Sequence, residues 1–129
     1  MSTSGGRPVE RVRALRGATS VEADDPAAIE AATGQLLREL FDRNGVASGD
    51  LISMIFTATP DLSSAFPAAA ARGLGLEDVP LLCSVEIEVP GSIPRCIRVL
   101  VHLTTAREPE ELQHVYLERA RSLRTDLDV

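Results

Sequence analysis

The chain of 129 residues carries a net charge of −6, and it has no basic run that would form a nucleic-acid surface. All 13 basic residues are arginine, which excludes Schiff-base chemistry on a lysine amine. Hydrophobic residues make up 44% of the chain but aromatic residues only 3%, so the core is built from Leu, Ile, Val and Ala. This length predicts a single domain over residues 11–129, after a flexible N-terminal tail over residues 1–10.

The cysteine content indicates a reducing compartment. Cys83 and Cys96 are the only two cysteines, and no signal-peptide pattern precedes them, so both are expected to be free thiols. No apolar run approaches the roughly 20 residues that a membrane span needs. We therefore expect a cytoplasmic protein with neither a membrane partner nor a nucleic-acid partner.

The first quarter of the chain predicts a strand and a long helix. Residues 12–18 form the strand, and the segment 17–20 is expected to turn. Asp25 is suited to cap a helix that has Pro26 at its first position, and the apolar periodicity stops at Asn44-Gly45.

The middle of the chain predicts another strand and a short helix. Residues 51–58 are nearly all apolar, as expected for a strand covered on both faces, and Thr59-Pro60-Asp61 ends it. Residues 66–72 combine a leading proline with alanines, which favours a short helix closed by Gly73 and Gly75.

The last third predicts two strands and a helix. Strands over residues 79–89 and 93–103 flank Pro90-Gly91, which suits a type II turn, so we expect them to pair antiparallel. A final helix is expected from about Pro109 to Arg121. The predicted fold is α+β: a mixed sheet with one long and two shorter helices in the order β-α-β-α-β-β-α. One face of such a sheet lacks cover, which predicts oligomerisation.

Two charged residues stand out in the predicted strands. Arg98 lies in the centre of an apolar strand, and a guanidinium cannot lose its proton, so it needs a carboxylate, carbonyl groups or an anionic ligand. Glu86 lies across the expected turn. The two residues lie on a solvated sheet face, form a cross-strand pair, or line a pocket together. Arg16, just before the expected turn, favours the pocket, whereas Arg72 at a helix end suits a dipole partner.

Other kinds of site are not supported. His102 and His114 lie in no cluster with metal-ligand spacing, so we expect no metal. Cys83 and Glu86 would point to opposite faces of a regular strand, and no Cys-His nucleophile is indicated. Tyr116, one helical turn after Leu112 in the expected last helix, has core packing as its default role.

Five segments, in order and spacing, resemble the AroH-type chorismate mutases over residues 12–127: "LRGATS", "TATPDLSSAFPAAAAR", "VPLLCSVEIEV", "CIRVLVHL" and "HVYLERARSLRTDL". The resemblance implies a homotrimer that forms a pseudo-α/β barrel, with an active site at each subunit interface. It also implies the cofactor-free Claisen rearrangement of chorismate to prephenate in phenylalanine and tyrosine biosynthesis.

The same resemblance assigns roles to individual residues. As catalytic residues it implies Arg98 at the ether oxygen, Glu86 at the substrate hydroxyl and Arg16 at a carboxylate. The implied substrate-binding residues are Arg72, Tyr116, Cys83, Phe66, Leu82, Leu123 and Arg124. Leu82 stands where a small polar residue, commonly threonine, is expected, so a side-chain hydrogen bond is lost there.

A pericyclic reaction needs no nucleophile, metal or general acid, and this chain offers none. Because the substrate is a dianion and the protein is acidic, this interpretation requires Arg16, Arg72, Arg98 and Arg124 to converge. Two alternatives remain: a noncatalytic trimer that binds a small carboxylate as a regulator, and an imine deaminase of similar trimeric architecture.

Overall fold

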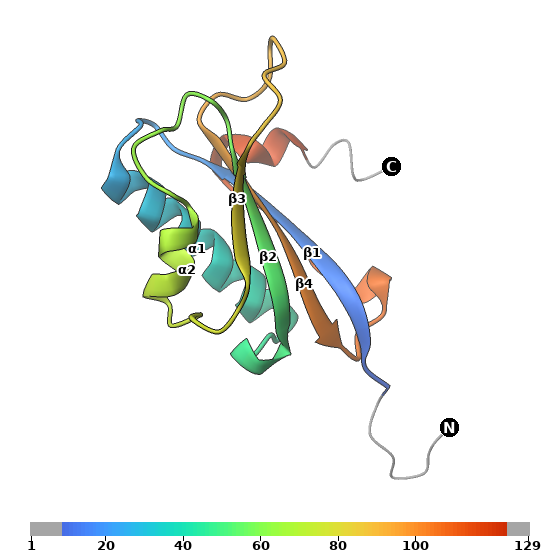
Figure 1. Cartoon of the computed structure of the whole chain (residues 1–129). Coiled ribbons are helices and arrows are strands. Elements are labelled where there is room, and N and C mark those ends of the chain that lie inside the picture. The colour runs from blue at the N-terminus through green and yellow to red at the C-terminus, as the bar shows by residue number, and fades with distance from the viewer. Residues whose placement is uncertain (1–8, 124–129) are drawn as a thin grey trace.

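The computed structural model describes residues 9–123 as one mixed sheet with two helices on one of its faces (Figure 1). The elements in chain order are β1 (Arg11–Ser20), α1 (Pro26–Asn44), β2 (Leu51–Ala58), α2 (Ala68–Gly73), β3 (Leu81–Val85), β4 (Cys96–Thr105) and β5 (Val115–Tyr116). Single 3-10 segments lie at Ser48–Asp50, Pro109–Glu111 and Glu118–Leu123. The predicted mixed sheet is thus confirmed.

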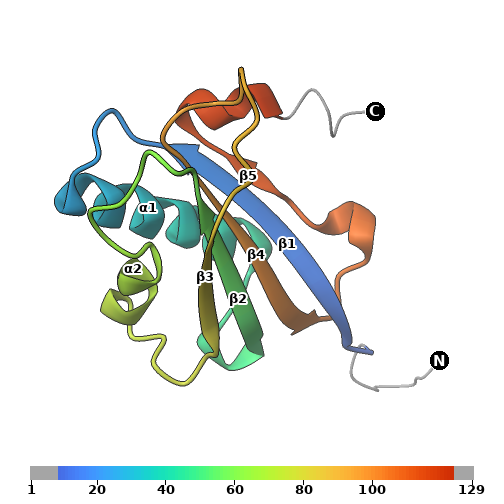
Figure 2. The same cartoon turned by 45° about the horizontal axis from the view of Figure 1, so that its top comes forward.

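The strand order is β3-β2-β4-β1-β5, with β4 in the centre. Strand β4 pairs antiparallel with both β1 and β2, whereas β3 joins β2, and β5 joins β1, in parallel. Both helices pack against the same face, as the turned view in Figure 2 also shows. Among residues 9–123, no helix covers most of the opposite face of β1, β2 and β4 (Figures 1 and 2).

The predicted caps of α1 are confirmed. Asp25 Oδ2 accepts a hydrogen bond from Ala28 N at 3.0 Å, and Pro26 is the first helical residue. Gly45 ends the helix in the left-handed region at φ 61°, which glycine adopts without strain. Leu36, Leu37 and Leu40 then bury one side of α1 against the sheet.

Strand β4 shows the alternation that its sequence predicts. Ile97, Val99, Val101 and Leu103 are buried on one side of the strand, and Arg98 is exposed on the other. Strand β2 lies as predicted, but the expectation that both its faces are covered is wrong within one chain. Only Met54 and Phe56, on the side of the helices, are fully buried there.

The turn predicted over residues 17–20 is wrong, because β1 continues through this segment. Its backbone stays paired with β4 up to Ser20 opposite Cys96. Gly17 serves close packing here instead of a turn: a Cβ on it would lie 2.7 Å from Leu40 Cδ1. The smallest residue is needed where α1 crosses the strand.

The predicted antiparallel hairpin of residues 79–89 and 93–103 is also wrong. Strand β3 ends at Val85 and pairs with β2 only, so β2 separates it from β4. The turn itself exists: Ser92 N donates to Val89 O at 3.1 Å, and Gly91 has φ 86°. A long connection, rather than a two-strand hairpin, therefore carries the chain from β3 to β4.

The final helix is a further wrong prediction. The chain after Pro109 makes one 3-10 turn, the short strand β5 and another 3-10 segment. Asn44 holds this path: its Nδ2 donates to Gln113 O and its Oδ1 accepts from Gln113 N, each at 2.8 Å. These tertiary bonds, together with the edge of β1, outweigh local helix propensity.

Helix α2 starts at Ala68, two residues after the predicted start, and Gly73 is its last residue. Cys83 and Cys96 are free thiols. Within residues 9–123, no helix has the length and apolar character that a membrane crossing requires.

Candidate active site

A cavity of about 390 Å³ opens on the face of the sheet opposite the helices. Side chains and backbone from β1, β2, β4 and β5 form its walls. The lining residues are Arg16, Gly17, Ala18, Ile55, Thr57, Arg98, Val99, Leu100, Tyr116 and Leu123. The cavity thus combines two guanidinium groups and a phenol with a largely aliphatic surface.

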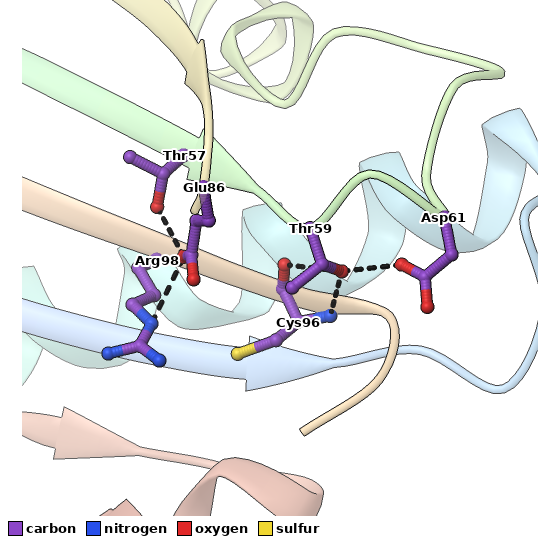
Figure 3. Close-up of polar contacts among 6 residues, drawn as sticks. All are labelled: Thr57, Thr59, Asp61, Glu86, Cys96 and Arg98. Atoms are coloured by element: carbon purple, nitrogen blue, oxygen red, sulfur yellow. Dashed lines mark hydrogen bonds and ion pairs between the residues drawn. The ribbon is translucent and has the colours of Figure 1, made fainter. Parts of the chain in front are cut away.

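Arg98 is paired with Glu86, as Figure 3 shows. Arg98 Nε lies 3.0 Å from Glu86 Oε2, and the same oxygen accepts a hydrogen bond from Thr57 Oγ1 at 2.6 Å. The Glu86 side chain is 15% exposed and that of Arg98 is 44% exposed. The carboxylate is therefore sheltered, while the guanidinium reaches into the open part of the cavity.

The topology explains how these side chains meet although their strands are not neighbours. Thr57 on β2 pairs with Arg98 on one side and with Ser84 on the other. Glu86 N donates to Ala58 O at 3.0 Å, which extends the β2–β3 ladder just past the end of β3. The Glu86 side chain then passes over β2 to reach the guanidinium.

Arg16 and Tyr116 come from β1 and β5 and line the same cavity. Burial raises the pKa of the Tyr116 hydroxyl above its usual value near 10.0, although Arg16 and Arg98 partly oppose this. The phenol therefore keeps its proton at neutral pH and can donate a hydrogen bond. Arg16 N donates to His114 Nδ1 at 3.0 Å, which ties β1 to the segment that leads into β5.

The His114 imidazole is neutral under the same conditions. Burial lowers the pKa of His114, and the nearby charge of Arg16 lowers it further. The neutral tautomer leaves Nδ1 free to accept the bond from Arg16 N.

Several predicted site residues lie outside this cavity. Phe66 is 73% exposed before α2, Leu82 is 62% exposed on β3, and Arg72 lines a separate hollow with Leu76 and Glu77. Cys83 packs against the helix-covered core, so its thiol lies on the other face of the sheet. These residues do not meet Arg98 within one chain.

The required convergence of four arginines is thus only half met in a single chain. Arg16 and Arg98 share the cavity, whereas Arg72 does not, and Arg124 lies outside the described residues. Leu123, the last residue that the structure describes, also lines the cavity.

Sequence reasoning missed Thr57 and Ile55. Both lie on the pocket side of β2, opposite Arg98 and Leu100 respectively. The alternation of β2 places them on one face, but the sequence does not show that β2 lies between β3 and β4. Nothing in their residue types alone indicated a site.

The arrangement suits a small anionic ligand. Fixed guanidinium groups stabilise negative charge, the phenol can donate a hydrogen bond, and the aliphatic walls suit the apolar part of such a ligand. Among residues 9–123, no group of three or more His, Cys, Asp or Glu side chains could hold a metal ion. Fold and cavity together define a mixed α+β protein with an arginine-lined pocket on its open sheet face.

Comparison with known proteins specifies the class further. The profile of the family "Chorismate mutase type I" matches residues 12–127. "Chorismate mutase AroH" of Thermus thermophilus is 50% identical over 118 residues, 91% of this chain and 97% of the relative. The protein of the same name from Bacillus subtilis (strain 168) is 40% identical over 119 residues, 92% of this chain and 94% of the relative.

A solved structure agrees. "Chorismate mutase from Clostridium thermocellum Cth-682" superposes with a TM-score of 0.84 at 45% identity, covering 85% of this chain and 98% of that one. The chain belongs to the AroH-type, or type I, chorismate mutase family, and it is an isomerase.

Proposed function

We propose that the cavity around Arg98 rearranges chorismate to prephenate, as a step in the biosynthesis of phenylalanine and tyrosine. The observation that carries the proposal is the orientation of Arg98. Its Nε is paired with Glu86, and its terminal NH₂ groups point away from the carboxylate (Figure 3). A permanent cation is thereby presented to the cavity that Arg16 and Tyr116 also line.

The reaction is an intramolecular pericyclic rearrangement. The C–O bond breaks ahead of C–C bond formation, so negative charge builds on the ether oxygen. A fixed guanidinium at that oxygen stabilises the transition state by about 3 kcal/mol or more in a water-poor site. Arg98 is the group suited to this role.

Glu86, Arg16 and Tyr116 would bind and orient the substrate. The Glu86 carboxylate accepts the hydrogen bond of the substrate hydroxyl, while Arg16 and Tyr116 bind carboxylate groups. Selecting the folded conformer of a flexible dianion removes an orientation cost that reaches roughly 7 kcal/mol in well-aligned systems. Catalysis then needs no cofactor.

We further propose that the protein is a homotrimer whose subunit interfaces complete the sites. Strand β3 lies at the edge of the sheet, and several apolar side chains on it, beyond its end and before α2 are exposed. These are Phe66, Leu82, Val85, Ile87 and Val89, each between 55% and 87% exposed. Exposed apolar side chains gathered along one edge are typical of a protein interface.

Such an interface would also supply the site residues that one chain leaves out. Phe66, Arg72 and Leu82 of one subunit would line the cavity of the next, with Arg124 at its mouth. The enzyme would then be a single domain over residues 11–129 that assembles as a pseudo-α/β barrel in the cytoplasm.

The loss of chorismate's ultraviolet absorbance, with prephenate identified as the product, tests the proposed function. Wild-type protein should convert chorismate rapidly, and Arg98→Ala should abolish most of the rate. Arg38→Ala, which removes an exposed arginine from the outer side of α1, is the matched control and should keep the wild-type rate. Absence of conversion by the folded wild-type oligomer would contradict the proposal and favour a noncatalytic carboxylate-binding protein.

A further inference from the structure

We infer that Thr57 is a positioning residue of this active site. Its hydroxyl holds the Glu86 carboxylate in place, and the carboxylate in turn holds Arg98 through Nε, so that the terminal NH₂ groups face the substrate. The inference deepens the proposed function and rests on it for its kinetic consequence.

The Glu86 side chain has to reach across β2 to meet Arg98. Neighbouring strands lie roughly 4.8 Å apart, so β3 and β4 are about 10 Å apart with β2 between them. Glu86 follows the end of β3 and Arg98 belongs to β4, so the carboxylate must come to rest above β2. Thr57 is the β2 residue directly opposite Arg98, and Figure 3 shows its hydroxyl directed at the carboxylate.

One oxygen of the Glu86 carboxylate is shared by Thr57 and Arg98. Thr57 has one hydroxyl proton, and it donates that proton to Glu86 Oε2 at 2.6 Å. The same oxygen accepts from Arg98 Nε at 3.0 Å. The carboxylate is thus fixed from two directions, and the ion pair uses the inner nitrogen of the guanidinium instead of its terminal groups.

The surroundings explain why a hydroxyl is needed at this position. Ile55 and Leu100, the next pair along the same face of β2 and β4, offer no hydrogen bond to a carboxylate. Without the Thr57 hydroxyl, Arg98 would be the only side-chain partner of Glu86 among residues 9–123, and the carboxylate could rotate to face the terminal NH₂ groups, a common bidentate geometry. It would then compete with the developing negative charge of the substrate.

The expected consequence appears mainly in kcat. Carboxylate binding by Arg16 and Tyr116 is unaffected, so Thr57→Val should lower kcat roughly 10-fold or more and change KM by less than about 3-fold. Thr57→Ser, which keeps the hydroxyl, should restore most of the rate. Thr33→Val removes a buried hydroxyl that bonds Ile29 O inside α1, and it is the matched control for the general cost of losing such a group.

A double-mutant cycle distinguishes positioning from a merely structural role. If Thr57 acts through Glu86, then Thr57→Val should change kcat less than about twofold when it is added to Glu86→Gln. The inference would be overturned if Thr57→Val lowered kcat equally in the wild-type and Glu86→Gln backgrounds. It would also be overturned if Thr57→Val left kcat unaltered, or if Thr57→Ser failed to restore it. Thermal unfolding of each variant shows that the folded oligomer is compared throughout.

A measurement independent of turnover separates this inference from the proposed function. The Nε–H signal of Arg98 in a ¹H–¹⁵N spectrum, assigned by its loss in Arg98→Ala, should move in Thr57→Val and return in Thr57→Ser. An Arg98 signal unmoved in Thr57→Val would contradict the positioning role even in an active enzyme. If the wild type fails to convert chorismate, the proposed function fails, and the Arg98 signal still decides whether Thr57 fixes the ion pair.

Discussion

The His114 imidazole accepts a hydrogen bond from the backbone of Arg16, with 3.0 Å between Arg16 N and His114 Nδ1. The bond joins the strand that carries one cavity arginine to the segment that leads into Tyr116. It requires a neutral imidazole, because a protonated ring has no acceptor nitrogen. The integrity of this side of the cavity is therefore linked to pH.

We predict that the protein loses stability as the pH falls below the ordinary His pKa of 6.5. The pKa of His114 is lowered in the folded state by burial and by Arg16, so the unfolded chain takes up the proton first. The free energy of unfolding consequently decreases as the pH drops from 6.5 through the folded pKa, and this contribution is constant above that window. Between pH 7.5 and pH 5.5, the free energy of unfolding measured in urea should fall more in the wild type than in His114→Gln. An equal fall in the two proteins would contradict the prediction.

A methyl group at position 17 should destabilise the fold. The Cβ of Gly17→Ala would lie 2.7 Å from Leu40 Cδ1 and 3.1 Å from Leu36 Cδ1, and both leucines are fully buried. Overpacking of this kind costs about 1–3 kcal/mol of unfolding free energy. Gly49→Ala, where no atom lies within 4 Å of the added Cβ, should stay within about 0.5 kcal/mol of wild type in the same urea titration.

Loss of the Asp61 carboxylate should loosen the start of β4. Arg95, which has a positive φ of 48°, donates its backbone N–H to the Asp61 carboxylate at 2.9 Å. Thr59 Oγ1 donates to the same carboxylate at 2.5 Å. Thr59 Oγ1 in turn accepts from Cys96 N at 2.9 Å (Figure 3).

Asp61→Ala removes the acceptor on which this chain of bonds ends, and it should lower the unfolding free energy by about 1–3 kcal/mol. Asp78→Ala, at an exposed position, should have little effect. Comparable destabilisation by both substitutions would show that Asp61 has no special role.

The proposed homotrimer depends on the apolar segment that follows β3. Ile87 is 87% exposed in one chain, so Ile87→Glu should shift sedimentation from trimer to monomer and reduce turnover, since a buried unpaired charge opposes association. Gln35→Glu adds the same charge to the exposed side of α1 and should leave the trimer intact. A wild-type monomer, or a trimer unaffected by Ile87→Glu, would refute this interface.

Local signals predicted much of the fold. Asp25, Pro26 and Gly45 specify the ends of α1 through their own backbone chemistry, and the turn at Pro90-Gly91 is likewise local. Such features need no knowledge of distant residues, which is why the sequence suffices for them.

The pairing of strands and the path of the last segment were not predictable in this way. An alternating strand can pair with either neighbour, so the sequence did not reveal that β2 separates β3 from β4. The helix-forming residues after Pro109 follow an irregular path because Asn44 and β1 bind their backbone. Both outcomes depend on contacts between distant parts of the chain.

The candidate site was likewise only partly predictable, because it also depends on contacts between distant parts of the chain. A pair between Glu86 and Arg98 was one of the alternatives that the sequence left open, but the expected geometry was wrong, since they are joined across β2 rather than across a hairpin. Thr57 was missed because only the strand order places it between them. Phe66, Arg72 and Leu82 remain predictions for a neighbouring subunit.

The contact across β2 has a consequence for how the family can vary. Glu86 is fixed by its backbone bond to Ala58 and by Thr57, whereas Arg98 is fixed by the strands on either side of β4. Neither position depends on the connection over residues 87–92. Within one chain, that connection can gain or lose residues during evolution without moving the two charges, so only the proposed subunit interface would constrain its length and its apolar side chains.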